Sequence, residues 1–508
     1  MKKQKIRFYA ALLCSSMVLS LVSMPVSAAE TGQLTNPPTS TEGPGSPESA
    51  SGNEAAAVLN GLYAALPVAN GVKEVATADE LTDALADSSI SIITLKDDVE
   101  ISSTLTVNRT VTLDLNGNVL KMTGSDSVIK VEADGDLTIQ DRNTTTQHTF
   151  NPHCKYQFWY IDMWELDKDG SEIVSGGVIT GGGGDQNNGG GVLVAGGTLT
   201  MAGGSIVGCS ARSRGGGVYL GKDSDTGKSG TFIMTSGSII GCAAQLGGGV
   251  YVTSGCTFVM ATSSNIHNCI ANNDGGGVIN HGTFQMRGGT ISTCTTVAFG
   301  GGGVCNNGTF IMSDGMIKGC TSPDGQYASG GGVRNSNQFT MTGGMIGDPD
   351  NENDASHVYN TSSQETTLTI SGNAKIYTDI TNVGILNADG GEIAGTMTND
   401  TNRYGTGSEG AAGSTEFHGK VTNTGTIRKG TFKNEVINES SGTINGGTFT
   451  GAITNNDGMV LDGDFSGATL NGMLVITFDP NNGDQPSTQK VNWSKDGAAL
   501  TAPDPVPT

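Results

Sequence analysis

Five cysteines recur at nearly regular spacing, and thiols in such a series could bind a metal or form disulfides. They are Cys209, Cys242, Cys269, Cys294 and Cys320, and each follows a short apolar run. A tetrahedral metal site needs thiolates that converge on one point, whereas residues one repeat apart lie along a line. Stacked strands also hold such side chains about 4.8 Å apart, beyond the usual Cβ separation of about 3.5–4.5 Å in a disulfide. We therefore interpret the series as a buried column of unpaired thiols, and we expect no cofactor and no metal.

Carboxylates and arginines, which the cleavage of a polysaccharide would require, are scattered along the chain. A lyase needs acidic residues that bind Ca²⁺ and a base that removes a proton, and a hydrolase needs a pair of carboxylates. The acidic candidates are Asp185, Asp274 and Asp314, and the basic candidates are Arg212, Arg214, Arg287 and Arg334. The acidic residues fall at turns rather than in one strand column, so we interpret them as surface residues.

Three other segments match functional patterns only in part. Asp348–Asp354 alternates carboxylates like a Ca²⁺ loop but lacks glycine at the sixth position, which favours a solvated acidic turn. His148 and the pair His153-Cys154 could bind a metal, but they are unevenly spaced. Gly405–Gly410 spells a dinucleotide fingerprint, yet no helical pattern follows it, so we interpret the match as chance.

Aromatic residues concentrate in one segment, 141–175, which departs from the pattern of the surrounding chain. The candidate glycan-binding residues there are Tyr156, Phe158, Trp159, Tyr160 and Trp164. If the segment is a strand, alternation puts Phe158, Tyr160 and Trp164 on one face and Trp159 on the other. One face would then pack on the scaffold while the other meets a flat sugar ring. The alternative is that all the rings form a small core that attaches the segment to the scaffold.

A repeated phrase reveals the scaffold that must position these residues. GGGV occurs six times, beginning at Gly189, Gly215, Gly247, Gly275, Gly301 and Gly330. An apolar pair that ends in methionine follows each, and Met234, Met260, Met286 and Met312 are 26 residues apart. Each unit holds three short runs rich in Val, Ile, Phe and Thr, which predict strands. Such units stack as a solenoid, with Met on Met and Phe on Phe along its core.

The repeat closely resembles the right-handed parallel β-helix of the pectate-lyase-like superfamily, particularly bacterial surface proteins with coils of the form GGGVYV…GTFxMxGGxIxxC. The resemblance covers roughly residues 76–350. It implies an all-β fold but no particular reaction, because lyases, hydrolases and adhesins share this architecture.

A second, shorter period follows residue 375 and predicts a short-coil continuation with fewer strands per turn. Phenylalanines recur at Phe417, Phe432, Phe449 and Phe465, and asparagines at Asn382, Asn399, Asn423, Asn438 and Asn455. We expect the asparagines to form a stacked amide ladder. The final segment, 474–508, resembles the opening of the Listeria–Bacteroides (internalin B-type) repeat of Gram-positive surface proteins, without its closing aromatic motif.

The remaining sequence predicts an exported protein with several segments. Residues 1–29 have the charged start, the apolar core and the small-residue cleavage site of a signal peptide. Residues 30–75 are expected to be a disordered linker, 76–355 the β-helix with an N-terminal capping helix, and 356–473 the second coil region. A capping box at Thr77–Glu80 begins that helix. The net charge of −22 argues against a nucleic acid partner.

The sequence therefore predicts a non-catalytic protein of the cell envelope that takes part in adhesion or glycan binding. Its partner would be a glycan or a host or cell-envelope surface, and we expect a monomer with no transmembrane segment once the signal is removed. One alternative is a polysaccharide lyase or glycoside hydrolase on the same fold. Another is a purely mechanical stalk.

Overall fold

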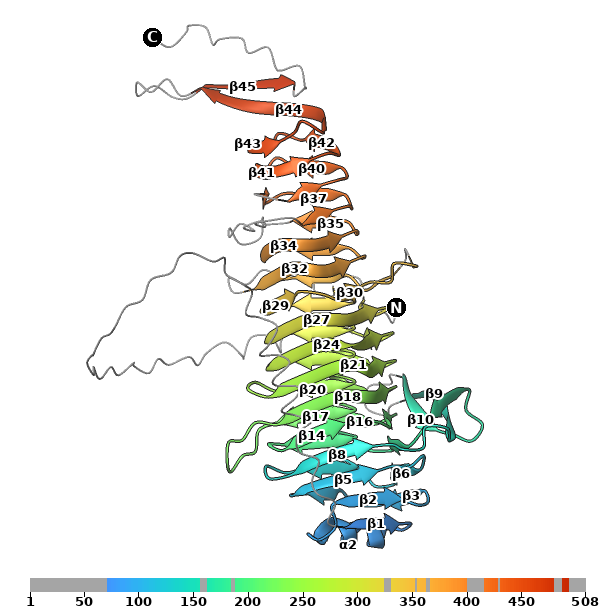
Figure 1. Cartoon of the computed structure of the whole chain (residues 1–508). Helices are drawn as coiled ribbons and strands as arrows, with labels where there is room; N and C mark the ends of the chain where they lie inside the picture. Colours follow the sequence, from blue (N-terminus) through green and yellow to red (C-terminus); the bar gives the residue numbers. More distant parts are fainter. Residues whose placement is uncertain are drawn as a thin grey trace, which may run out of the picture. The chain divides into compact units, whose positions relative to one another are not determined.

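The computed structural model describes residues 71–155, 162–183, 188–323, 330–351, 354–361, 366–399, 415–427, 430–478 and 487–492. Almost all of these residues lie in or between short strands that pair in parallel, one coil on the next (Figure 1). The predicted all-β fold and its parallel β-helix are confirmed. The predicted signal peptide and most of the predicted linker lie outside the described residues.

Three sheets, parallel throughout except for β45, form the solenoid. The large sheet contains β1 (Val72–Val75), β2 (Ile92–Leu95), β3 (Val99–Ile101), β5 (Thr110–Asp114), β6 (Val119–Met122), β8 (Asp136–Gln140), β12 (Val178–Thr180), β14 (Thr198–Met201), β15 (Ser205–Val207), β18 (Thr231–Ile240), β21 (Thr257–His267), β24 (Thr283–Ser292), β27 (Thr309–Lys318), β29 (Gln338–Met341), β30 (Met345–Ile346), β32 (Thr367–Ile376), β34 (Ile385–Ile393), β36 (Glu416–Phe417), β38 (Thr426–Ile427), β39 (Thr431–Phe432), β41 (Thr443–Phe449) and β43 (Met459–Asp464).

The second sheet contains β4 (Leu105–Val107), β7 (Ile129–Val131), β13 (Val192–Ala195), β17 (Val218–Gly221), β20 (Val250–Val252), β23 (Val278–Asn280), β26 (Val304–Asn306), β28 (Val333–Asn335), β31 (Val358–Asn360), β33 (Ile380–Asn382), β35 (Met397–Asn399), β37 (Val421–Asn423), β40 (Val436–Asn438), β42 (Ala452–Asn455), β44 (Thr469–Phe478) and β45 (Ser487–Asn492). The short sheet contains β16 (Ser210–Arg214), β19 (Ala243–Leu246), β22 (Ile270–Asp274) and β25 (Thr295–Thr296).

A coil runs from the second sheet to the large sheet and then to the short sheet, as from β13 through β14 and β15 to β16. The GGGV phrase forms the sharp corner back to the second sheet. In one such corner Gly247 has φ 67°, a left-handed conformation that side chains disfavour. A Cβ on the next residue, Gly248, would collide with the carbonyl groups of Ile270 and Gly276. The repeated glycines therefore let neighbouring coils approach closely at this corner.

Identical side chains stack along the core, as the repeat predicts. Phenylalanine rings lie face to face in successive coils, with centroid separations of 4.9, 4.8, 4.8 and 4.5 Å along Phe232, Phe258, Phe284, Phe310 and Phe339. Methionines pair in the same register two residues later. The five cysteines of the series are fully buried and free, as expected for a column.

An asparagine ladder runs along the second sheet and is longer than the sequence period predicts. Each side-chain Nδ2 donates to the Oδ1 of the next, at 2.7–2.9 Å, along Asn280, Asn306, Asn335, Asn360, Asn382, Asn399, Asn423, Asn438 and Asn455. All nine are at most 2 % exposed. The ladder crosses the expected division at 355/356, where pairing from β28 through β31 to β33 continues unbroken.

The short sheet ends before the shorter coils begin. Its last strand is β25, which is followed only by an isolated bridge between Thr295 and Thr321. Later described coils use the large and second sheets alone, and this confirms the predicted continuation with fewer strands per turn. At the far end, β45 pairs antiparallel with β44.

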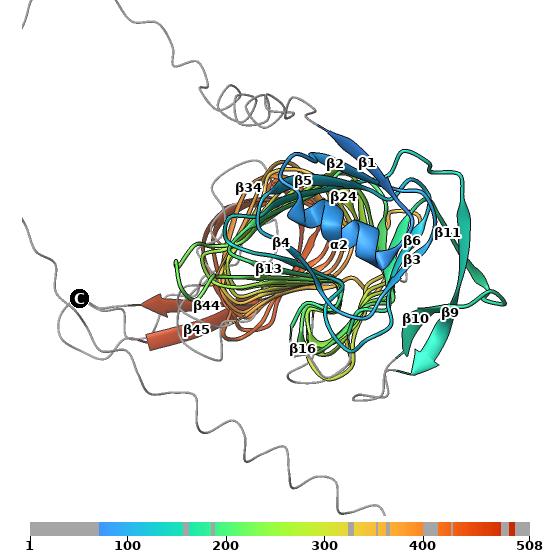
Figure 2. The ribbon, with the colours of Figure 1, turned by 90° about the horizontal axis from the view of Figure 1, so that it is seen from below.

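A helix covers the first coil. In α2 (Ala78–Ala86), the N-cap Thr77 side chain accepts from the Glu80 backbone N–H, as the predicted capping box requires. The Glu80 carboxylate accepts from the Ala76 backbone N–H at 2.8 Å instead of from that of Thr77. Leu81 and Ala84 face the core, and Figure 2 shows α2 lying across the end of the solenoid. The Arg109 guanidinium donates to the carbonyl groups of Ala84 and Leu85, both at 2.9 Å, so it satisfies the helix C-terminus. Among the described residues, no helix has the length and apolar character needed to span a membrane.

Replacing Asn360 by alanine should destabilise the protein by about 1–3 kcal/mol. The change removes the bonds from Asn335 at 2.8 Å, to Asn382 at 2.7 Å and to the Ile385 carbonyl at 3.0 Å, leaving buried polar atoms without partners. Urea unfolding of the full chain measures the effect. The control is Asn456→Ala, because Asn456 is exposed. Equal effects of the two changes would contradict a stabilising role for the ladder.

Candidate functional site

Two carboxylates fix the base of the aromatic segment, where the chain leaves the solenoid after β8 and returns before β12. Asp114 is fully buried and pairs with Nε of Arg142 at 2.8 Å. Asp141 accepts hydrogen bonds from the backbone N–H groups of Gly117 at 2.7 Å and Gly177 at 2.8 Å. These bonds tie both the departure and the return of the segment to neighbouring coils, so its position on the solenoid is fixed.

The segment forms a separate antiparallel sheet, here called the excursion sheet. Its central strand is β9 (Gln147–Lys155), which pairs with β10 (Asp162–Leu166) on one side and β11 (Glu172–Ser175) on the other. Figure 1 shows β9 and β10 beside the coils. The interruption of the repeat at 141–175 is therefore a separate antiparallel sheet beside the coils.

Trp164 attaches the excursion sheet to the solenoid. Its side chain is 7 % exposed and packs in a small core with Phe150 and Val174 of the excursion sheet and with coil residues. The coil residues of this core are Val119, Val178, Val207 and Ile240. A Cβ on Gly241 would collide with the Trp164 ring, so glycine there makes room for it. The Trp164 backbone N–H also donates to the Gly241 carbonyl at 3.0 Å.

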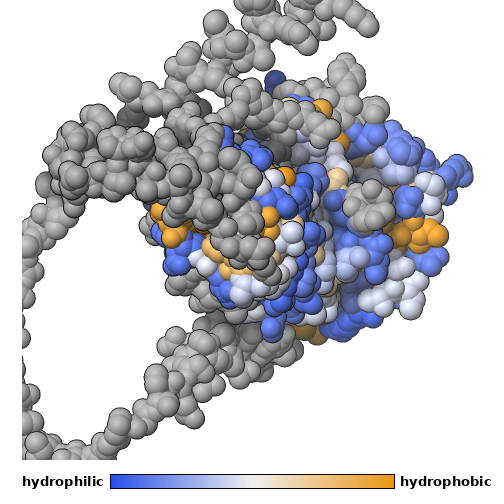
Figure 3. All heavy atoms as spheres, turned by 90° about the horizontal axis from the view of Figure 1, so that it is seen from above, coloured by the Kyte–Doolittle hydropathy of each residue, from blue (hydrophilic) through white to orange (hydrophobic). Residues whose placement is uncertain are grey.

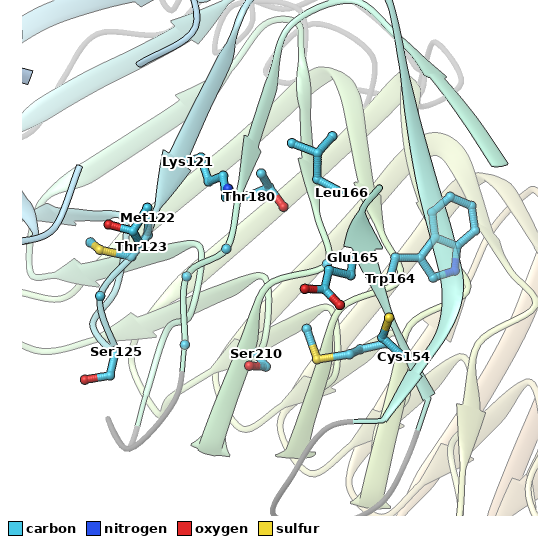
Figure 4. A pocket seen from close by; sticks show the side chains of 16 residues that line it. Lys121, Met122, Thr123, Ser125, Cys154, Trp164, Glu165, Leu166, Thr180 and Ser210 are labelled. Carbon is cyan, nitrogen blue, oxygen red and sulfur yellow. The ribbon is translucent and has the colours of Figure 1, made fainter. Parts of the chain in front are cut away.

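A cavity of about 660 Å³ lies between β10 and the coils. Figure 4 shows Lys121, Thr123 and Ser125 on one side and Glu165 and Cys154 on the opposite side. Its lining consists of Lys121, Met122, Thr123, Gly124, Ser125, Cys154, Met163, Trp164, Glu165, Leu166, Thr180, Gly181, Gly182, Gly183, Gly208 and Ser210. We refer to this space as the excursion cavity.

The charged groups of the excursion cavity do not form a catalytic pair. Lys121 Nζ already pairs with Glu100 at 2.9 Å. Glu165 is the one carboxylate among the described lining residues. Its hydrogen bond, together with burial, raises the pKa of the Cys154 thiol to about 11. A thiol with that pKa stays protonated at neutral pH and is a weak nucleophile.

The composition of the cavity suits a hydroxylated ligand. Hydroxyl groups and glycine peptides offer donors and acceptors, while Met122, Met163 and Leu166 provide apolar surface. Saccharides present the same mixture of hydroxyl groups and C–H faces. The arrangement can therefore orient a sugar, whereas hydrolysis would need a second carboxylate within about 5–9.5 Å of the first.

The candidate binding residues are only partly described. Trp164 lines the excursion cavity but is mostly buried, so the indole also serves as an anchor of the sheet. Tyr156, Phe158, Trp159 and Tyr160 lie outside the described residues. Their assignment to glycan binding stays a prediction.

The other chemical candidates do not converge. Asp274 pairs with Arg334 at 3.6 Å, and the Asp314 carboxylate accepts from the Gly315 backbone N–H at 2.7 Å. Asp185 lies outside the described residues. In the acidic turn, Asp348 pairs with Lys318 at 3.0 Å. Asp354 there accepts backbone N–H bonds from Gly319, Asp348 and Ser356.

The histidines of the excursion sheet also point to separate partners. His148 Nε2 lies 3.0 Å from the Gly117 carbonyl, and His153 Nδ1 lies 3.8 Å from Asp162. Within the described ranges, no three His, Cys, Asp or Glu side chains are grouped so that they could hold a metal.

Sequence reasoning missed most of the cavity lining. Lys121, Glu165, Thr180 and Ser210 come from four different strands, and no motif joins them. The available signal was the interruption of the repeat at 141–175, which marks where an added element can enclose space against the coils.

Comparison with known proteins gives one family match. The family model described as a putative pectate lyase-like adhesive domain matches residues 72–181. A solved structure described as SRRP of L. reuteri 53608 is 14 % identical and covers 79 % of this chain and 99 % of its own, with a TM-score of 0.17. Similarity at that score carries no argument here. No curated protein matches the chain.

Replacing Trp164 by alanine should destabilise the excursion sheet by about 3–5 kcal/mol, because the change empties the centre of its attachment core. Hydrogen exchange of β9, β10 and β11 in the full chain measures the loss. The matched control is Ile173→Ala, since Ile173 is 60 % exposed on the same sheet. Unchanged protection of the three strands in the Trp164 variant would contradict the anchoring role.

Proposed function

We propose that this chain is an exported, adhesin-type protein of the cell envelope that binds a saccharide in the excursion cavity. The observation that carries the proposal is the position of the adhesive-domain match. Residues 72–181 include the whole excursion sheet and all the cavity residues from Lys121 to Gly181. The matched region thus contains the structural feature that departs most from the repeat.

Binding is favoured over catalysis by the chemistry of the cavity. A retaining or inverting hydrolase requires two carboxylates across the scissile bond, and Glu165 has no such counterpart among the described lining residues. A lyase requires a free base, and Lys121 is engaged by Glu100. What remains is a space that can recognise hydroxyl groups without activating them.

The surface offers little support for a broad hydrophobic interface. On the face that Figure 3 shows, apolar residues form small separate patches among hydrophilic ones. The exposed large apolar residues of the described part form no broad patch but lie singly or in close pairs, at Val72, Ile173, Ile311, Val297/Phe299 and Met459/Leu461. Recognition through a cavity fits this surface better than docking through a flat apolar face.

A stalk role is compatible with the same structure. The nine-member asparagine ladder and the stacked phenylalanines join each coil to the next over most of the described length. Such coupling favours a stiff scaffold. In this proposal the scaffold carries the binding cavity near its N-terminal end.

The test is glycan-array binding by the full chain, with Glu165→Gln and Trp159→Ala as variants. Glu165→Gln should weaken binding about tenfold or more, the equivalent of a charge-assisted hydrogen bond of about 1.5–3 kcal/mol. Trp159→Ala tests the predicted aromatic contact and should abolish binding with the melting temperature nearly unchanged.

The control is Glu172→Gln, which changes the same residue type on β11, away from the excursion cavity. This variant should bind like the wild type. Absence of any glycan or envelope-surface binding by the wild type would refute the proposal. Wild-type affinity in both Glu165→Gln and Trp159→Ala would refute it as well.

A further inference from the structure

A second cavity lies on the outer face of the second sheet and is separate from the excursion cavity. It has a volume of about 260 Å³ and is lined by Thr104, Thr106, Asp126, Ser127, Lys130, Asn188 and Leu193. None of these residues lines the excursion cavity. Figure 2 shows the neighbouring elements: β4 and β13 belong to the second sheet, and β16 lies in the short sheet beside it.

An unsatisfied acceptor lines this second cavity. The side-chain Oδ1 of Asn188 is buried and has no hydrogen-bond partner in the described structure. A buried polar atom without a partner is costly, so such atoms indicate an absent donor. The backbone around it is fixed, because Ser127 Oγ donates to the Asn188 carbonyl at 3.4 Å and Thr104 Oγ1 donates to the Ser127 carbonyl at 2.8 Å.

The other polar groups limit the kind of ligand that fits. The Asp126 carboxylate adds a second acceptor, while Lys130 is a donor that already pairs with Glu132 at 2.9 Å. An anion without a hydroxyl group, such as sulfate, could bind Lys130, but it could not donate to Asn188 and it would face Asp126. Hydroxyl groups both donate and accept, so they can satisfy all three residues.

An aromatic column continues from the cavity along the outer face of the sheet. Thr106, Lys130, Leu193, Tyr219 and Tyr251 occupy the same register position in successive coils. Tyr219 and Tyr251 stack with ring centroids 5.5 Å apart. Because neighbouring strands are about 4.8 Å apart, the Tyr219 ring stands one coil beyond Leu193 at the edge of the cavity.

The tyrosine column is held firmly in place. The Arg214 Cζ lies 5.4 Å from the centroid of the Tyr251 ring, within cation–π range. Arg214 also bridges in parallel register to Asn188, the residue with the unsatisfied oxygen. Tyr251 stacks on one face of Tyr219, and Leu193 is its register neighbour on the other side, so the edge of the half-buried ring is the part that a sugar can contact.

We propose that this cavity and Tyr219 form a second saccharide site, which takes a neutral, hydroxyl-rich oligosaccharide. One sugar unit occupies the cavity and donates a hydroxyl hydrogen bond to Asn188 Oδ1. The next unit extends along the coil axis and contacts the edge of the Tyr219 ring. The inference rests on the proposed function only in that both ligands are saccharides, since the two cavities share no residue.

The test is calorimetric titration of the full chain with neutral trisaccharides, namely maltotriose, cellotriose and tri-N-acetylchitotriose. Trigalacturonate serves as the anionic comparison. At least one neutral trisaccharide should bind, and Leu193→Trp should reduce its affinity at least tenfold because the larger ring fills the cavity. Tyr219→Ala should also reduce the affinity, more for the trisaccharide than for the corresponding monosaccharide.

A second variant keeps the test decisive if Leu193→Trp does not fold. Asn188→Leu removes the unsatisfied oxygen, so its unfolding midpoint should equal or exceed that of the wild type while neutral saccharide binding falls at least tenfold. Glu172→Gln, which lies on β11 and lines neither cavity, should leave this binding unchanged. Loss through Glu165→Gln with retention in Asn188→Leu and Leu193→Trp would place the ligand in the excursion cavity and overturn the second site. Binding of trigalacturonate alone, or of none of the trisaccharides, would overturn it too.

Discussion

The structure depends on one constraint: each coil must lie in register on the coil before it. Parallel pairing between coils fixes every side chain about 4.8 Å from its counterpart. A column of identical residues is therefore stable only if the side chain can pack against, or hydrogen-bond to, a copy of itself. Stacked phenylalanines, methionines and cysteines meet this condition through close packing. Asparagine meets it through hydrogen bonding, since its amide donates to one neighbour and accepts from the other.

The same constraint determines where binding sites can occur. The inward-facing side chains fill the core columns. The outward-facing side chains of the strands form a regular surface without deep hollows. Enclosed space therefore arises where the chain departs from the coil. The excursion sheet encloses one cavity against β6 and β12. The other cavity lies at the corner between the second sheet and the short sheet, which begins with β16.

The sequence predicted most of the scaffold because periodicity reports directly on register. The GGGV corners, the phenylalanine and cysteine columns, the capping helix and the shorter later coils follow from residue types at fixed intervals. The asparagine ladder was predicted only from Asn382 onward. Its earlier members, such as Asn280 and Asn306, sit inside the glycine-rich units, where the methionine period dominates the pattern.

The cavities were not predictable in the same way. Their residues come from coils far apart in sequence, as Lys121 and Ser210 do, and no interval connects them. The interruption at 141–175 indicated the place but not the lining. Trp164 illustrates the difficulty, since an aromatic residue in such a segment can serve as an anchor, a ligand contact or both.

The central claim is that the coils near the N-terminus bind saccharides and the later coils form the scaffold. Hydrogen exchange of the full chain, with and without a saccharide that binds it, tests this claim most directly. The account predicts added protection in residues 121–130, 162–166, 180–183 and 188–193, with the strands from β28 to β42 unchanged. Ligand-induced protection confined to β28–β42 would contradict it.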